Sequence, residues 1–356
     1  MGIIRVLLAI SVLLAHAGVF PITGNQLVGG VIAVQCFYII SGFYMALILT
    51  QRYVMRADFY FNRFLRLYPT YWFLLLASTA VCLLLGKPTF VNVILSSDVL
   101  RWDGKIFMLF ANVFIFGSDA MMFMFPSAEG LRFTTDFTAH GATLYSFHVM
   151  QQAWTLPVEM AFYAMAPFVV KRPLGLIIIL ILSLTVRYFV YAHISTSDPW
   201  NYRFFPSEAA FFCAGSLAYH VYAAVREFRG SQAVGPIFLV ALVLYIANFE
   251  RVPVFIGSTF LFSGSLLQFY AFVLVALPFV FCLTARNSLD RWFGELSYPI
   301  YLTHYFVIEG ASHLPRLFGT AVYNVMLNTV VISAAINLLV QTPIEMLFKR
   351  RVKDAM

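Results

Sequence analysis

The chain has 356 residues, of which 61% are hydrophobic and only 11% are charged. Soluble domains average about 25% charged residues, so this composition excludes an ordinary water-soluble globular protein. The formal net charge is +7, but the basic residues lie at the ends of apolar runs, which indicates orientation in a bilayer rather than nucleic-acid binding.

Long apolar runs recur along the chain, and each can supply roughly the 20 residues that a bilayer core about 30 Å thick requires. They predict an all-α, polytopic transmembrane bundle of about ten spans over residues 1–345, followed by a basic cytoplasmic tail at 346–356. Most of the 23 lysines and arginines fall on one side of this arrangement, which places both termini in the cytoplasm. The expected spans are 4–20, 28–50, 70–86, 156–170, 174–193, 206–225, 233–249, 266–285, 296–312 and 319–342.

The first span carries two polar side chains on one face. His16 follows Arg5 by eleven residues, which is close to three full helical turns and about 16 Å along the axis. Arg5 would then lie at the cytoplasmic mouth and His16 near the middle of the bilayer. A neutral imidazole there could take a proton from a hydroxyl, or it could simply bond a neighbouring helix.

The next two spans hold a small-residue pair and an arginine pair. Ser41-Gly42 indicates a packing notch, because no nucleophile-elbow sequence surrounds it. Arg63 and Arg66 share a helix face at i and i+3, just before Pro69 begins the third span. Two guanidiniums at a cytoplasmic edge suit a bidentate grip on phosphates, although ordinary basic anchoring explains the same spacing.

Segment 87–155 contains no comfortable span. Its apolar piece, IFMLFANVFIFG, is short and suits an interfacial or re-entrant helix. Counting it as a span would move Lys171 and Arg172 to the outer side, against the charge rule. We therefore expect the whole segment on the outer side of the membrane.

The following span opens with AWTLPVEMAFYAMAP. Trp154 is expected at the outer interface, and Pro157 in the first helical turn. Glu159 and Tyr163 then stack at i and i+4. A carboxylate one turn into a span is a functional candidate, which could orient the imidazole or bind an acceptor hydroxyl. A partner for the helix dipole is the alternative.

The later spans add secondary candidates. Glu208 and His304 lie within or near spans, where either could serve only as a hydrogen bond between helices. Glu345 and the basic run after it indicate an interfacial anchor. Each cysteine lies singly in an apolar run, so neither a metal site nor a disulfide is expected.

The order of these motifs resembles the membrane-bound acyltransferase 3 family, which acylates surface polysaccharides, lipopolysaccharide and related glycans. The resemblance runs from Arg5 to about Glu345. The motifs that carry it are the Arg5–His16 helix, FYIISGFYMA, Arg63 and Arg66 with LYPTYW, AWTLPVEMAFYAMAP and ELSYPIYLTH.

The resemblance implies roles for the matching residues. His16 looks like the catalytic histidine, with Arg5 and Glu159 as further catalytic residues. Arg63 and Arg66 match the pair associated with the acyl-CoA donor. The residues expected at the substrate are Trp154, Tyr163, Glu208 and His304.

Two positions depart from the family's pattern. Thr155 replaces the usual serine of a Trp-Ser-x-x-x-Glu element, and Met160 stands where many members carry a second acidic residue. If that second carboxylate helps to bind the acceptor in those members, acceptor binding differs in this chain.

We therefore expect a multi-pass O-acyltransferase of the bacterial inner membrane. It would move an acyl group, acetyl in the first place, from acyl-CoA to a hydroxyl of an exopolysaccharide, lipopolysaccharide or other envelope glycan, including a lipid-linked oligosaccharide. Polysaccharide-assembly proteins are expected partners, and neither a metal nor a nucleic acid is expected.

Two alternatives come from other functional classes. One is a secondary transporter or flippase, in which His16, Glu159, Arg187 and Glu208 would relay protons. We see no internal repeat of the kind that transporter halves often leave, which weighs against it. The other is a scaffold, without catalysis, for a glycan-assembly complex.

Overall fold

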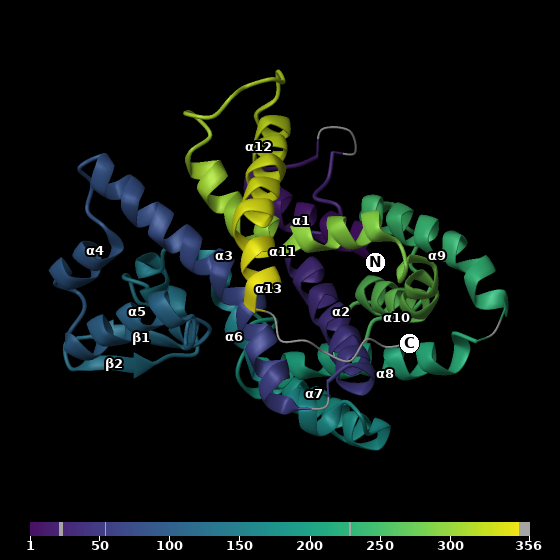
Figure 1. Cartoon of the computed structure of the whole chain (residues 1–356). Helices are drawn as coiled ribbons and strands as arrows, with labels where there is room; N and C mark the ends of the chain where they lie inside the picture. Colours follow the sequence, from purple (N-terminus) through teal and green to yellow (C-terminus); the bar gives the residue numbers. More distant parts are fainter. Residues whose placement is uncertain (21–23, 54, 228, 349–356) are drawn as a thin grey trace.

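A computed structural model describes residues 1–20, 24–53, 55–227 and 229–348. Within these ranges the chain is mostly helical, with one large helical bundle and a smaller lobe at its side (Figure 1). The helices of the bundle are α1 (Gly2–Ala17), α2 (Gly30–Gln51), α3 (Arg56–Leu84), α6 (Thr155–Val169), α7 (Pro173–His193), α8 (Phe205–Val225), α9 (Arg229–Ala247), α10 (Gly264–Thr284), α11 (Ser288–Glu309), α12 (Ala321–Ile336) and α13 (Thr342–Phe348).

A helix lies at every position where a span is expected. Among the described residues, five helical segments are long and apolar enough to cross a membrane, whereas other helices of the bundle are shorter or less apolar. The count of ten spans and the side of each terminus therefore stay predictions. Of the expected tail at 346–356, only the end of α13 lies within the described residues. The five segments are Gly30–Gln51, Arg56–Leu84, Pro173–His193, Gly264–Thr284 and Ala321–Phe348.

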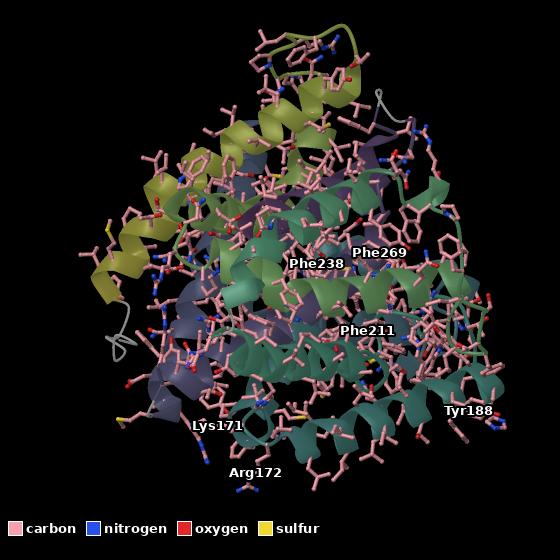
Figure 2. All side chains as sticks on the ribbon, turned by 90° about the vertical axis from the view of Figure 1, so that its right-hand side faces the viewer. Lys171, Arg172, Tyr188, Phe211, Phe238 and Phe269 are labelled. Carbon is pink, nitrogen blue, oxygen red and sulfur yellow. The ribbon has the colours of Figure 1, made fainter. Side chains whose placement is uncertain are left out.

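The outer face of α7 shows how the bundle suits a lipid environment. Leu174 is 71% exposed and Phe189 is 58% exposed. Figure 2 shows Lys171 and Arg172 at one end of this helix and Tyr188 toward the other. An apolar surface between a basic end and an aromatic end is typical of a helix that contacts lipid.

Helix α3 continues through Pro69, so the expectation that this residue begins the span is wrong. Arg63 and Arg66 lie inside the helix instead of before it. Pro69 has no N–H, which deprives the Leu65 carbonyl of its usual helical partner. The side chain of Gln341, in a π-helical turn (Asn337–Gln341) between α12 and α13, donates to that carbonyl oxygen at 2.9 Å. A distant side chain therefore compensates for the proline.

Residues 87–154 form the lobe beside α3, at the left of Figure 1. The helix that contains the apolar piece has 13 residues, which is too short to cross a bilayer core. An antiparallel hairpin corrects the all-α expectation, and Gly130 follows its tight turn with φ 125°. The elements of the lobe are α4 (Phe90–Ser96), α5 (Trp102–Phe114), β1 (Met124–Ser127), β2 (Gly130–Phe133) and the 3-10 turns η1 (Ala120–Phe123), η2 (Phe137–Ala139), η3 (Leu144–Phe147) and η4 (Gln151–Trp154). Another 3-10 turn, η5 (Phe249–Arg251), follows α9 in the bundle.

Hydrogen bonds attach the lobe to α3, and another hydrogen bond joins the hairpin to α5 within the lobe. The Tyr71 hydroxyl donates to the Asn112 carbonyl oxygen at 2.6 Å, and the Trp72 ring N–H donates to the Val113 carbonyl oxygen at 2.8 Å. Within the lobe, the backbone N–H that follows Gly130 donates to Asp103 at 2.6 Å, and this bond lowers the pKa of the Asp103 carboxyl. The lobe is thereby attached to the helix that carries Arg63 and Arg66.

Helices α2 and α8 cross at two glycines. A Cβ atom on Gly42 would lie 2.0 Å from the Phe212 carbonyl oxygen, and one on Gly215 would lie 1.8 Å from the Ile39 carbonyl oxygen. Small residues allow two backbones to approach this closely inside a membrane bundle. The packing notch predicted at Gly42 is therefore confirmed, and it fixes the direction of the neighbouring side chains on α2.

Candidate active site

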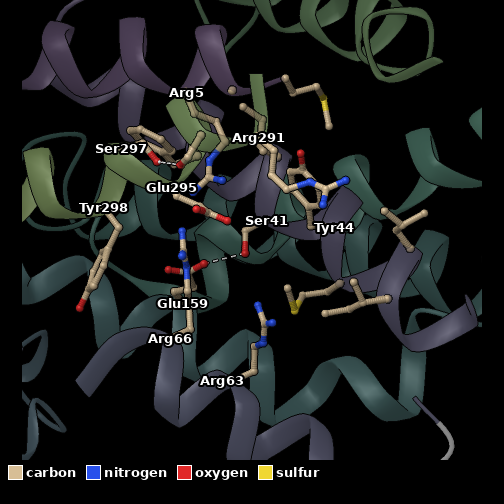
Figure 3. A pocket seen from close by; sticks show the side chains of 18 of the residues that line it. Arg5, Ser41, Tyr44, Arg63, Arg66, Glu159, Arg291, Glu295, Ser297 and Tyr298 are labelled. Carbon is tan, nitrogen blue, oxygen red and sulfur yellow. Dashed lines mark hydrogen bonds between the residues drawn. The ribbon is translucent and has the colours of Figure 1, made fainter. Parts of the chain in front are cut away.

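A cavity of about 470 Å³ opens between α1, α2, α3, α6 and α11. Figure 3 shows charged side chains from separate helices converging on it, among them Arg5, Arg63, Arg66 and Glu159. These are four of the residues that the sequence marks as candidates, and the fold brings them together. The cavity is therefore the first candidate for a binding site.

The arginines of the cavity are incompletely paired. Within the described residues, no carboxylate forms an ion pair with Arg5 or Arg63, whereas Arg66 lies 3.6 Å from Glu345. The Nε atom of Arg63 is buried without a hydrogen-bond partner. Because buried positive charge is costly without a counter-charge, this arrangement suits an anionic ligand. Glu345, expected in an interfacial anchor, instead lines the cavity.

Glu159 is fixed by two hydroxyl groups. Ser41 Oγ donates to its Oε1 atom at 2.7 Å, and the Tyr163 hydroxyl donates to the same oxygen at 2.5 Å. Among the described residues, Glu159 bonds Ser41 and Tyr163 while His16 bonds Tyr305, so the structure does not support the expectation that Glu159 orients the imidazole. Ser41 is a site residue that the sequence analysis missed, because only the packing of α2 against α6 reveals its partner.

The two histidines that the sequence marks as candidate site residues form a second cluster. His16 is absent from the lining of the cavity; it is exposed, and its Nδ1 atom lies 3.1 Å from the Tyr305 hydroxyl. Its ring stacks on His304 with 5.4 Å between centroids. His304 is fully buried, with Nδ1 2.7 Å from the Tyr301 carbonyl oxygen. The fold thus pairs His16 with His304, and it separates the pair from the arginines.

Tyr301 lies between the two clusters, because its side chain lines the cavity and its backbone carbonyl contacts His304. Its hydroxyl donates to the Gln152 carbonyl oxygen at 2.5 Å and accepts from Thr155 Oγ1 at 2.9 Å. Thr155 lies one helical turn before Glu159 on α6. A polar chain therefore links the wall of the cavity to the histidines.

Two of the expected substrate-binding residues lie elsewhere. Glu208 is fully buried, where it accepts from Arg187 at 2.6 Å and from Gln35 at 3.1 Å, and it does not line the cavity. Trp154 lies under Arg203, whose guanidinium carbon is 4.2 Å from the ring centroid. Substrate contact by either residue stays a prediction. The four residues of the transporter hypothesis fall into three separate clusters, which gives that hypothesis no support.

The turns that precede α6 carry a buried histidine of their own. His148 is 3% exposed, and neither of its ring nitrogens has a hydrogen-bond partner. Burial lowers the pKa of His148 to about 4, so the ring is neutral at pH 7. Burial also raises the pKa of Tyr145 in the same segment. Neutral side chains therefore fill this part of the lobe.

The described residues contain no group of three histidine, cysteine or acidic side chains placed to hold a metal ion. All four cysteines are free thiols, and Cys36 and Cys213 are buried. The chemistry available at the two clusters is therefore that of guanidinium, carboxylate, hydroxyl and imidazole groups.

Comparison with known proteins gives one match. The family model Acyl_transf_3, described as an acyltransferase domain, matches residues 1–341. No curated protein and no solved structure matches the chain. The matched range includes the histidine pair and every residue that lines the arginine-lined cavity except Glu345.

Proposed function

The chain belongs to the acyltransferase 3 family, and from this premise we propose that it moves an acyl group from acyl-CoA to a hydroxyl of an envelope glycan. Its family and its apolar helices make it a membrane acyltransferase. We propose acetyl as the acyl group and the bacterial inner membrane as the location. The proposed acceptors are exopolysaccharide, lipopolysaccharide or a lipid-linked oligosaccharide, handled together with polysaccharide-assembly proteins.

The observation that carries the donor proposal is the meeting of five arginines in one cavity, where Arg5 and Arg63 form no ion pair with a carboxylate among the described residues. The five are Arg5, Arg52, Arg63, Arg66 and Arg291. The phosphates of CoA supply the anionic groups that such a cavity suits. Arg63 and Arg66 point from adjacent turns of α3 and can bind a phosphate through paired N–H donors. Arg5 adds a third positive charge from α1.

The proposed reaction takes place where the extended arm of CoA, which carries the thioester, reaches the histidines. The family resemblance gives His16 the role of general base, which removes the proton of the acceptor hydroxyl. The hydroxyl oxygen then attacks the thioester carbon, the carbon–sulfur bond breaks, and the proton passes to the departing thiolate. Arg5 and His16 are about 16 Å apart along α1, so the extended arm of CoA has to bridge the two clusters.

Acetyl transfer by the purified protein tests this proposal. The chain, reconstituted in liposomes, receives radiolabelled acetyl-CoA on the side of the arginines together with glycan from cells that lack it. We expect labelled glycan and stoichiometric release of CoA. His16→Ala should reduce transfer about 100-fold or more, the usual contribution of acid–base catalysis.

The control is Arg172→Ala, which removes an exposed arginine from the end of α7 and should leave transfer unchanged. Full transfer by folded His16→Ala protein would contradict the role of the histidine. Failure of the folded wild-type protein to release CoA with any of the three classes of acceptor would contradict the proposed activity.

A further inference from the structure

His304 is a buried histidine with one nitrogen in use and one unpaired. Its side chain is fully buried, and its Nε2 atom has no hydrogen-bond partner. Its Nδ1 atom lies 2.7 Å from the Tyr301 carbonyl oxygen. A buried polar atom without a partner costs free energy, so each one in a native structure needs an explanation, and a role in a reaction is one such explanation.

The contact at Nδ1 fixes the tautomer of this ring. A carbonyl oxygen can only accept, so Nδ1 of His304 must carry the hydrogen and donate it to Tyr301. In the neutral ring, Nε2 then holds a free lone pair. The lone pair can accept a proton, and it has no other described group to bond.

The same contact orients the ring as a catalytic base is usually oriented. In nucleophile–base pairs, a third group accepts the hydrogen bond from the far nitrogen of the histidine and stabilises the imidazolium when it forms. The backbone carbonyl of Tyr301 occupies that position for His304. His16 stacks against the ring at 5.4 Å, so the two imidazoles share one site.

Other unpaired polar atoms accompany His304 along the boundary with the cavity. The Tyr38 hydroxyl is buried without a partner at a residue that lines the cavity, and Oε1 of Gln152 is buried without a partner beside Tyr301. A movement of the Tyr301 side chain would join the cavity to the histidines along these groups. They could bond the polar arm or the carbonyl group of a donor that enters.

We propose that His304 is a second catalytic histidine, whose Nε2 atom takes the proton of the acceptor hydroxyl. This inference rests on the proposed acyl transfer. The O–H bond breaks as the oxygen bonds to the thioester carbon, the carbon–sulfur bond then breaks, and the thiolate leaves with the proton from Nε2. His304 returns to its neutral form with Nδ1–H still bonded to Tyr301.

In this arrangement the two histidines have different tasks. His16 is exposed and held by Tyr305, so it receives the acceptor and positions its hydroxyl. His304 is buried, so in the proposed reaction it accepts the proton of the acceptor hydroxyl and passes it to the thiolate. His304 then takes the general-base role that the family resemblance gives to His16, and His16 binds the acceptor, so His16→Ala still reduces transfer.

His304→Asn tests the assignment in the full chain. The asparagine amide can still donate near the position of Nδ1, so the bond to Tyr301 is kept, but no nitrogen remains at the ε position. We expect kcat for acetyl transfer to fall about 100-fold or more, while KM for acetyl-CoA and the melting temperature change little. The control is His313→Asn, which alters an exposed histidine outside both clusters and should transfer acetyl normally.

Near-normal kcat in His304→Asn would overturn the proposal, because it would show a purely structural hydrogen bond. If that variant does not fold, His304→Gln is tested in its place, because its amide lies near the ε position. We expect folded His304→Gln protein to be inactive in acetyl transfer. An active His304→Gln would equally overturn the proposal. Absence of turnover in the wild-type protein would contradict the proposed function itself, whereas normal turnover in either variant would contradict only the role of His304.

Discussion

Gln341 shows how one side chain stabilises the helical turn that carries Arg66. Its amide donates to the Leu65 carbonyl oxygen at 2.9 Å, accepts from Thr70 Oγ1 at 2.9 Å and donates to Glu345 at 2.6 Å. Arg66 directly follows Leu65 on the same helical turn. The direction of that arginine therefore depends on a residue from the other end of the chain.

Gln341→Leu should destabilise the fold and weaken donor binding. The substitution leaves the Leu65 carbonyl, already deprived by Pro69, without a partner, which costs about 1–3 kcal/mol. We expect a lower melting temperature in detergent and a raised KM for acetyl-CoA. Asn328→Leu, which removes an amide in contact with an exposed loop, is the control. An unchanged melting temperature in Gln341→Leu would contradict the compensating role.

Single residues also mark the limit of what the sequence can predict. Arg5, Arg63, Arg66 and Glu159 could be selected because ionisable groups are rare in apolar runs, and they do meet in one cavity. The link from Ser41 to Glu159 could not be predicted, because it depends on how two helices pack. The contact of His16 with His304 joins the first and the eleventh helix, and no local pattern predicts such a pairing.

At the level of helices, the crossing of α2 and α8 sets the geometry of the cavity wall. Gly42→Ala would place a methyl group 2.0 Å from a backbone carbonyl oxygen, so one helix must move. We expect destabilisation of about 3 kcal/mol or more, measured as a lower melting temperature and a smaller folded fraction on gel filtration. Gly257→Ala, where no heavy atom lies within 4 Å of the added carbon, should match the wild type. Equal stability of the two variants would refute the close crossing.

The lobe should lose stability in acid through His148. The folded pKa is about 4 and the ordinary value is 6.5, so the unfolded chain binds the proton first as the pH falls. Stability is then complete above pH 6.5 and declines toward pH 4, by about 3 kcal/mol in all. Melting temperatures measured between pH 4 and pH 6.5 test this prediction. His148→Phe should reduce the fall in melting temperature at low pH, whereas His313→Phe should leave that fall unchanged. An equal fall in both variants would show that another group is responsible.

The elements themselves were largely predictable from apolar run length. A helix lies at each expected span, because each run is apolar and carries few charges, although only five segments of the described residues are long and apolar enough to cross a bilayer. The passage of α3 through Pro69 was not predictable, since the compensating bond comes from Gln341. The hairpin at 124–133 was missed because MFPSAEGLRF is short and lacks clear alternation.

At the scale of the whole molecule, the bundle separates an arginine-lined cavity from a pair of imidazoles. The arginines gather where α1, α2, α3, α6 and α11 meet, and the histidines lie about 16 Å along α1 from Arg5. Such a separation suits a donor with a charged end and a long reactive arm. The buried pair of Arg187 and Glu208 lies apart from both clusters and joins α7 to α8.

The central claim is that the arginine-lined cavity binds acyl-CoA, and calorimetric titration of CoA into the purified protein tests it most directly. We predict that the wild type and Arg172→Ala bind with equal affinity. The double substitution Arg63→Ala/Arg66→Ala should weaken binding about 100-fold, since it removes two sets of charge-assisted hydrogen bonds. Undiminished binding of CoA by the folded double variant would contradict the claim.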